Sequence, residues 1–322
     1  MFVLSELAEF SRGYRESTFF NFLMNRAFKL DKRTADKIEK LAKKKFFNNA
    51  DIDILEFLMD EGLIFEISET EADMFICSKK TYNSPYLIEY LVAHFTGKYS
   101  LELLTNLCQD SMIPFLIIKS DMDLVEELSQ LISRNSYPSS VSIYTDNQHL
   151  IESGNKFRIY IQKNTFDSFV NRDSLSINKL LFSETKNYNS YFNRKLFIGE
   201  HGEIKCSPES EENFGQIETM YQLLDIVLIE DFQKYWKVSK DMCDVFKDCE
   251  FRRMCVDNRI PHKRNDGSYY FVQECNYNPY IAKWKNEDGY VSLAVSGVDV
   301  SSEKLNIDHD RIATINKRIW GD

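Results

Sequence analysis

The spacing of apolar and polar positions changes along the chain, and at the amino end it indicates a small mixed unit. Residues 13–30 alternate loosely between aromatic and polar side chains, which predicts two short strands. Good helix formers follow at 32–45, and a second amphipathic helix closes at Gly62, where a left-handed cap is expected. The apolar run 63–67 then predicts a strand. This order of elements predicts a winged-helix-like unit over residues 1–72.

A unit of this kind has an exposed strand edge beside an apolar helix, and such an edge can accept an extended peptide as an added strand. The candidate peptide-binding side chains come from the predicted strands and the second helix, and they are Phe20, Phe22, Met24, Ile52 and Leu55. The alternative is a packing subdomain that holds no ligand. The basic run at 43–45 is typical of a solvated helix face, and it can also attract an acidic peptide.

The middle of the chain, residues 73–190, has a pattern in which buried strands alternate with helices. The expected elements are a helix within 84–108, a strand at 113–118, a helix at 123–133 and strands at 140–144 and 157–161. A strand, a helix and a strand with short connections form a βαβ unit, which implies parallel pairing. A complete eightfold barrel needs roughly 250 residues. This region therefore predicts a partial, eroded (β/α) barrel.

Cysteines are concentrated toward the carboxyl end. The sequence has seven cysteines, and Cys243, Cys249 and Cys255 lie in one short stretch. A predicted hairpin over 195–206 ends in Cys206, and Cys275 follows later. Thiolates on short loops can converge on a soft metal centre, such as an iron–sulfur cluster or zinc. The alternative is a set of buried free thiols in a domain that no longer binds metal.

Composition narrows the classes of function. Hydrophobic residues make up 43% and charged residues 28%, as in globular proteins. The net charge of −10 disfavours a dominant nucleic-acid surface. The sequence has no apolar run long enough to predict a membrane span and no secretory signal, so a reducing cytoplasm is expected. No phosphate-binding glycine loop, HExxH or GxSxG motif occurs, and the five histidines are scattered, so no catalytic residue is predicted.

The carboxyl-terminal third resembles a known family. The residues that carry the resemblance are Lys247-Asp248-Cys249-Glu250-Phe251-Arg252, Met254-Cys255-Val256-Asp257, Arg259 and Cys275-Asn276-Tyr277-Asn278-Pro279-Tyr280, preceded by Tyr191-Phe192-Asn193-Arg194, Cys206-Ser207-Pro208 and Phe214-Gly215. Together they are similar to the SPASM-domain peptide maturases of grasp-with-spasm systems, specifically over about 191–280. With the patterns above, this implies an α/β protein whose expected domains are 1–72 (peptide recognition), 73–190 (barrel-like), 191–285 (SPASM-like) and 286–322 (a tail packed on the core).

The sequence departs from the family in its cysteines. The CxxxCxxC motif of radical-SAM enzymes is absent, so S-adenosylmethionine is not expected as a cofactor. The resemblance implies cysteines where Phe246 and Asn258 stand, and neither side chain suits a soft cluster. One auxiliary cluster is therefore expected to be lost. A second would need three thiols, those of Cys249, Cys255 and Cys275, together with Cys243 or Cys206.

The resemblance implies an accessory protein without autonomous catalysis. It would bind the leader of a ribosomally synthesised precursor peptide and present it to a partner ATP-grasp ligase. Two alternatives are an iron–sulfur enzyme that modifies a peptide through one auxiliary cluster, and a zinc-stabilised structural module. In the tail, residues 290–295 predict a strand and residues 311–320 a helix.

Overall fold

The computed structural model describes residues 1–44, 46–47, 52–72, 81–145, 158–163, 170–208, 210–219 and 223–321. The chain divides into two compact units. The terminal unit comprises Met1–Tyr82, Phe169–Ser190 and Val238–Asp322, and the central unit comprises Asn83–Ser168 and Tyr191–Lys237. This division differs from the four consecutive segments expected from the sequence, because the chain passes from one unit to the other more than once.

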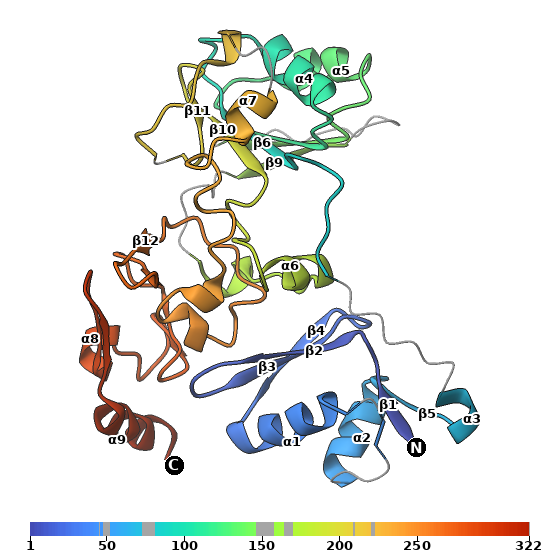
Figure 1. Cartoon of the computed structure of the whole chain (residues 1–322), viewed down its shortest axis with the longest axis vertical. Helices are drawn as coiled ribbons and strands as arrows, with labels where there is room; N and C mark the ends of the chain where they lie inside the picture. The colour runs from blue at the N-terminus through green and yellow to red at the C-terminus, as the bar shows by residue number, and fades with distance from the viewer. Residues whose placement is uncertain are drawn as a thin grey trace. The chain divides into compact units, whose positions relative to one another are not determined.

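The amino-terminal part of the terminal unit contains two small sheets and three helices (Figure 1). Its elements are β1 (Phe2–Leu4), β2 (Ala8–Arg12), β3 (Ser17–Asn21), β4 (Arg26–Leu30), α1 (Lys32–Ala42), α2 (Ile52–Asp60), β5 (Ile64–Glu66) and α3 (Glu69–Ala72). Strands β2, β3 and β4 form an antiparallel meander, and β1 pairs with β5. The two strands expected in 13–30, the two helices and the strand in 63–67 are confirmed.

Local sequence features explain where α1 begins and where α2 ends. The Asp31 side chain accepts a hydrogen bond from the Thr34 amide at 3.0 Å, which caps α1. Gly62 has a φ of 63°, the left-handed conformation that ends α2 and that glycine adopts without strain. The apolar faces of α1 and α2 then share one core with the Phe19 ring of β3.

The carboxyl-terminal part of the terminal unit consists of short elements. They are α6 (Lys179–Glu184), β12 (His262–Lys263), β13 (Tyr269–Tyr270), β14 (Tyr277–Asn278), β15 (Lys283–Trp284), α8 (Leu293–Ser296), β16 (Val298–Val300), β17 (Leu305–Ile307) and α9 (His309–Trp320). The helix expected at 311–320 is confirmed as α9. The strand expected at 290–295 is wrong, because Ser292 caps α8 through the Val295 amide and Gly297 ends it at a φ of 93°.

The central unit is built on a six-stranded sheet in the order β11-β10-β6-β7-β8-β9. Its elements are β6 (Tyr90–His94), α4 (Leu101–Asp110), β7 (Phe115–Lys119), α5 (Val125–Ile132), β8 (Ser140–Thr145), β9 (Arg158–Lys163), β10 (Lys195–Ile198), β11 (Ile204–Lys205) and α7 (Leu223–Val227). Strands β10, β6, β7, β8 and β9 are parallel, and β10 with β11 forms the expected hairpin. The mixed α/β class, the βαβ unit and the parallel sheet are confirmed.

The helix expected within 84–108 is confirmed only from Leu101 onward. Its first part contains strand β6, whose residues hydrogen-bond to β10 on one side and to β7 on the other, so α4 begins only after the Ser100 cap. Among the described residues after Phe214, the helical elements of the central unit are α7 and a short 3-10 turn at Ile217–Thr219. In the described parts of the chain, no helix is both long and apolar enough to cross a bilayer.

Candidate functional site

Strand β5 is paired on one side only among the described strands. The Ile67 amide donates to the Met1 carbonyl at 2.9 Å, and the Ser5 amide donates to the Leu63 carbonyl at 2.7 Å. In an antiparallel pair the hydrogen-bonded residues alternate, so the N–H and C=O groups of Ile64 and Glu66 point away from β1. Because no described residue pairs with them, these outward groups form an open backbone edge within the part of the chain that the structure describes.

The opposite side of β1 is already used. The Phe2 amide donates to the Phe47 carbonyl at 2.8 Å, and the Phe47 amide donates back to the Phe2 carbonyl at 3.0 Å. The two rings stack with their centroids 6.0 Å apart. Strand β1 is therefore held from both sides, and β5 is the edge at which this small sheet can grow.

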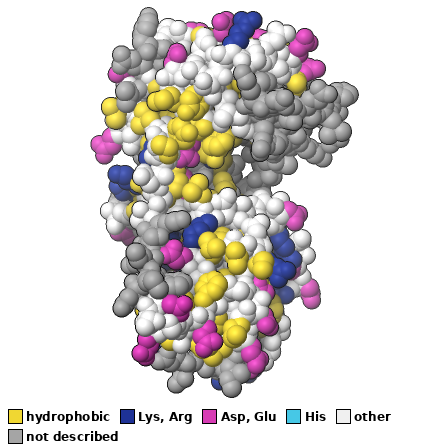
Figure 2. All heavy atoms as spheres, turned by 90° about the vertical axis from the view of Figure 1, so that its right-hand side faces the viewer, with side chains coloured by type: hydrophobic (Ala, Val, Ile, Leu, Met, Phe, Trp, Pro, Cys, Tyr) yellow, Lys and Arg dark blue, Asp and Glu magenta, His cyan; other side chains and the backbone are white. Residues whose placement is uncertain are grey.

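Four exposed side chains, which we call the apolar patch, lie around the end of α2 and on β5. They are Leu23, Met24, Met59 and Phe65, which are 52%, 55%, 56% and 44% exposed. Met59 and Phe65 flank Gly62 in the sequence, and a Cβ built on Gly62 would lie 3.7 Å from Leu23 Cδ2. Figure 2 shows hydrophobic side chains gathered on the lower, terminal-unit part of the visible face. An extended chain on β5 would have apolar side chains to contact.

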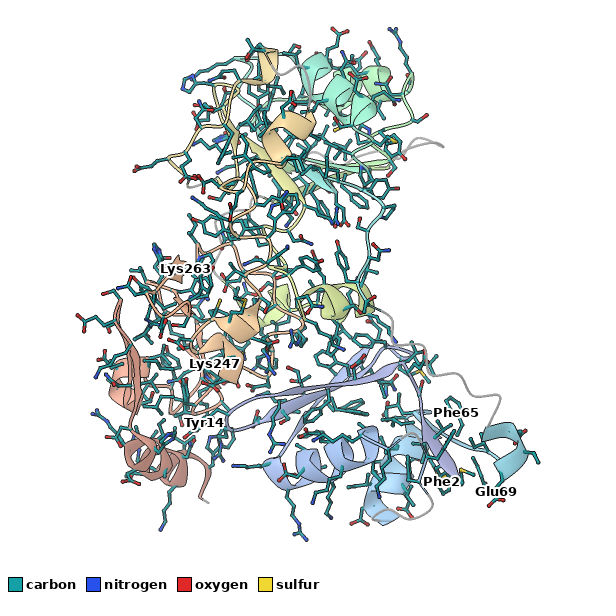
Figure 3. The ribbon with its side chains drawn as sticks, in the orientation of Figure 1. Phe2, Tyr14, Phe65, Glu69, Lys247 and Lys263 are labelled. Atoms are coloured by element: carbon teal, nitrogen blue, oxygen red, sulfur yellow. The ribbon has the colours of Figure 1, made fainter. Side chains whose placement is uncertain are left out.

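Acidic side chains surround the edge and the patch. Asp60 and Glu66 are exposed, and Figure 3 labels Glu69 at the start of α3, close to Phe65. The Asn21 side chain donates to the Glu61 carbonyl at 2.9 Å, which holds the turn between β3 and β4 against the end of α2. The local charge therefore favours a segment that carries Lys or Arg beside apolar residues.

The predicted peptide-binding residues have different environments in the structure. Phe20 is fully buried, with its ring centroid 5.1 Å from that of Phe182, and Phe22 packs on the same ring. Leu55 is partly buried against the core of α1 and α2, and the side chain of Ile52 lies outside the described residues. Met24 alone belongs to the apolar patch. A sequence signal that could have indicated this surface is the pair of large apolar residues, Leu23 and Met24, in the turn between two strands.

Three of the predicted metal ligands lie in one part of the terminal unit. Cys249, Cys255 and Cys275 belong to a hydrophobic cluster with Phe251 and Trp284. Burial raises the pKa of the Cys249 thiol well above its ordinary value, and the neighbouring Cys275 and Cys255 contribute in the same direction. Burial also raises the pKa of Cys255 to about 11. Without a metal, these groups are neutral thiols at pH 7.

The other two candidate ligands lie elsewhere. Cys243 is in a separate cluster with Val238 and Phe246, and its thiol donates to the Ser239 carbonyl at 3.5 Å. Cys206 is in the core of the central unit. Over the described ranges, no three His, Cys, Asp or Glu side chains are arranged to hold a metal ion. Cys249, Cys255 and Cys275 thus share a hydrophobic cluster without forming such a group, and iron–sulfur or zinc binding stays a prediction.

Cationic side chains surround Phe246, which stands where the resemblance implies a cysteine ligand. Arg259 Cζ lies 5.0 Å and Lys240 Nζ 5.5 Å from the centroid of the buried Phe246 ring. Arg259 also forms an ion pair of 2.6 Å with Asp257. Lys240 is buried and donates to the Cys255 carbonyl. The Arg259 and Lys240 cations thus lie against the Phe246 ring, and Arg259 is also paired with the Asp257 carboxylate within this segment.

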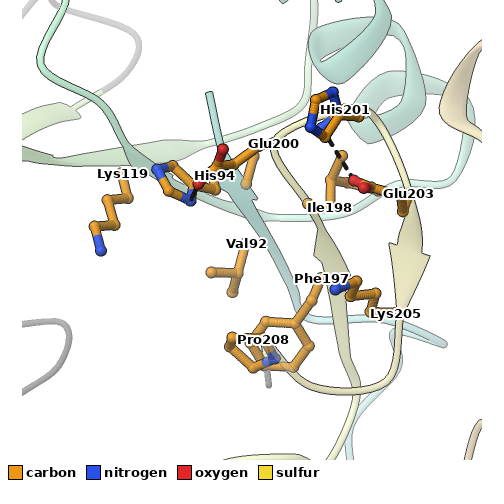
Figure 4. Close-up of a pocket in the computed structure, with 12 residues that line it drawn as sticks. Val92, His94, Lys119, Phe197, Ile198, Glu200, His201, Glu203, Lys205 and Pro208 are labelled. Carbon is orange, nitrogen blue, oxygen red and sulfur yellow. Dashed lines mark hydrogen bonds and ion pairs between the residues drawn. The ribbon is translucent and has the colours of Figure 1, made fainter. Parts of the chain in front are cut away.

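The central unit contains a cavity of about 360 Å³ at the carboxyl ends of β6, β7 and β10 (Figure 4). His94 Nδ1 lies 3.2 Å from Glu200 Oε1, and the His201 amide donates to Glu203 Oε2 at 3.0 Å. Partial desolvation favours the protonated form of Glu203, but hydrogen bonds from backbone amides outweigh it and hold its pKa below the ordinary value. This site was not predicted from the sequence, because the five histidines are scattered along the chain. His94 is the last residue of β6, and ligand sites in parallel sheets lie at the carboxyl ends of the strands. The feature that marks this site is therefore the place of His94 in the sheet.

Comparisons with protein-family models, with curated proteins and with solved structures find no match for this chain. The resemblance to SPASM-domain maturases therefore rests on the sequence motifs given above.

Proposed function

We propose that this protein is an accessory maturation protein for a ribosomally synthesised, modified peptide. The amino-terminal part of the terminal unit serves as a winged-helix-like recognition element, and the leader of the precursor adds to β5 as an extra strand. The observation that carries the proposal is the outward-facing backbone of Ile64 and Glu66. The bound peptide is presented to a partner ATP-grasp ligase, as the resemblance implies.

Strand addition supplies affinity through backbone groups and specificity through side chains. The edge offers two N–H donors and two C=O acceptors, each worth a net of about 1 kcal/mol when paired. Burial of the apolar patch adds about 25 cal/mol for each Å² removed from water. The leader best suited to this edge is extended, has apolar side chains at alternate positions and carries basic residues.

The acidic side chains near β5 change the expectation for the basic run at 43–45. Lys43 Nζ forms an ion pair of 2.9 Å with Glu39 on α1, so part of that charge is neutralised locally. Lys45 lies outside the described residues. Because Glu66 and Glu69 are beside the β5 edge, we propose a basic-apolar leader instead of an acidic one.

In this proposal the bond-forming chemistry belongs to the ligase. The sequence has neither the CxxxCxxC motif of radical-SAM enzymes nor a glycine-rich nucleotide loop. We also propose that the central unit derives from a (β/α) barrel and that the cysteine-bearing segment is SPASM-like. Iron and zinc quantification on anaerobically purified protein separates this proposal from the two metal-dependent alternatives.

The test uses the full chain and the precursor peptide encoded beside its gene, in a calorimetric titration. Glu66→Pro removes one outward N–H group but leaves the hydrogen bonds to β1 intact, since proline is tolerated at a strand edge. Glu66→Ala is the matched control, because it removes the same side chain and keeps the N–H. We expect Glu66→Pro to weaken leader binding about tenfold and Glu66→Ala by less than about threefold. Equal affinities for the two variants, or no binding by the unmodified chain, would contradict the proposal.

A further inference from the structure

The cavity of the central unit is not used by the proposed leader site. It lies where the carboxyl ends of three parallel strands meet, which is the usual position of ligand sites in such sheets. Its volume of about 360 Å³ is in the range of small-molecule sites. The chemical class of its ligand follows from the charges of the lining and from the hydrogen-bonding atoms that the protein leaves unused.

The ionic groups of the lining are compensated within the protein. Glu203 interacts electrostatically with Lys205 and accepts a hydrogen bond from the His201 amide at 3.0 Å. A Cβ on Gly199 would clash with Glu203 Oε2, so the glycine leaves the space that this carboxylate occupies on the turn. Lys119 has an interaction of its own. Two glutamates thus balance two lysines in the described lining, which favours a neutral ligand over a charged one.

The other carboxylate of the lining, that of Glu200, orients an imidazole. Glu200 Oε1 lies 3.2 Å from His94 Nδ1, and this nitrogen carries the proton because a carboxylate only accepts. In the neutral ring, Nε2 is then an acceptor, and among the described residues it has no partner. The ring of His201 differs, because its Nε2 accepts from Lys98 Nζ at 3.2 Å. His94 therefore offers a hydrogen-bond acceptor to a ligand that carries a donor.

An apolar wall lies beside this acceptor. Val92 and Phe197 come from β6 and β10, and Figure 4 shows them with Pro208 below His94. An apolar wall with a few placed polar groups is the usual composition of a small-ligand site, and the flat faces of Phe197 and Pro208 suit an aromatic ring. We infer that this cavity binds a neutral phenol, whose hydroxyl donates to His94 Nε2 while its ring lies on Phe197 and Pro208.

A phenol group has two sources, a free small molecule and the tyrosine side chain of a peptide. The site is separate from the proposed leader site, because the cavity is in the central unit and the β5 edge is in the terminal unit. A Glu66→Pro variant that loses leader binding would therefore still bind the phenol. Failure of one proposal is distinguishable from failure of the other.

The test is an NMR titration of the full chain at pH 8, above the range in which imidazoles usually titrate. The probes are p-cresol, its methyl ether 4-methylanisole, which cannot donate, and a capped tripeptide with tyrosine in the middle. We expect p-cresol to bind about fivefold more tightly than the ether, since one hydrogen bond is lost. Peptide binding at least as tight as that of p-cresol identifies a tyrosine side chain as the source, and weaker peptide binding identifies a small molecule. Equal binding of p-cresol and the ether, or no binding of either phenol, would overturn the inference.

Variants locate the site. His94→Phe removes the acceptor and should abolish the preference for p-cresol over its ether, whereas His262→Phe on β12, an exposed position, should leave it unchanged. Glu200→Ala, also at an exposed position, frees the imidazole and should reduce the preference, and Glu200→Gln, which keeps an acceptor oxygen, should restore most of it. The amide resonances of Ala93 and Gly199 should shift on adding p-cresol. A folded His94→Phe variant that keeps the fivefold preference would refute the assignment.

Discussion

The cysteine-bearing segment and the β5 edge belong to the same unit, but they use their polar groups in opposite ways. In the first, Arg259, Asp257 and Lys240 are buried or nearly so and are satisfied by one another, by backbone and by the Phe246 ring. In the second, the backbone of Ile64 and Glu66 faces outward. The segment on which the resemblance rests is internally satisfied, whereas β5 has backbone groups that no described residue pairs with.

The largest expected effect is in the cysteine-bearing segment. Arg259→Ala leaves the Asp257 carboxylate buried without its cation, and the free energy of unfolding should fall by about 3–5 kcal/mol. Chemical denaturation measures the change. Arg318→Ala on α9, an exposed position, is the control and should cost less than about 0.5 kcal/mol. A small effect of Arg259→Ala would mean that the segment is not held together in this way.

A second effect concerns pH. Burial raises the pKa of Glu250 to about 7, with the hydrogen bond from Tyr277 opposing the shift. Between its unfolded pKa and pH 7 the unfolded state loses this proton while the folded state keeps it, so stability should fall as pH rises from about 4.5 to 7. The loss should be on the order of a few kcal/mol and should disappear in Glu250→Gln. Denaturation curves at pH 5, 6, 7 and 8 for both proteins check this, and parallel profiles would contradict it.

The third effect tests the open side of the comparison. Phe65→Ser should weaken leader binding about tenfold, because an apolar contact of roughly 1.4 kcal/mol is removed. The Phe65 side chain is 44% exposed, so the stability of the fold should change little. Val295→Ser, at a residue 48% exposed on α8, is the matched control and should bind the leader as the unmodified chain does. The same loss in both variants would show that exposed apolar area in general, and not the patch, governs binding.

The sequence predicted well those elements whose two faces differ. Helices α1 and α5 have one apolar and one polar face, and both were predicted. Strand β6 was mistaken for helix because a parallel strand in the middle of a sheet is apolar on both faces, so the period of two disappears. The spacing of Leu87, Leu91 and Phe95 then fits a helical pattern by coincidence.

Strand β3 shows why the candidate site was only partly predictable. All five of its residues are buried, with Phe19 in the core of α1 and α2 and Phe20 in the cluster that contains Phe251 and Trp284. The alternation of side chains distinguishes the two faces of a strand. It does not show that residues more than 200 positions later in the chain pack on the second face. Phe20 was therefore assigned to a surface, and the open edge on β5 was identified only from its hydrogen-bond register.

The route of the chain through the terminal unit has a consequence for synthesis on the ribosome. Strands β1 and β5 and helices α1 and α2 all precede Ile67, so the residues of the β5 edge are synthesised before the carboxyl-terminal residues that pack on β3. The partners of Phe20 around Phe251 follow it by more than 200 positions. In a nascent chain, one face of β3 therefore stays uncovered until the residues around Phe251 have been synthesised.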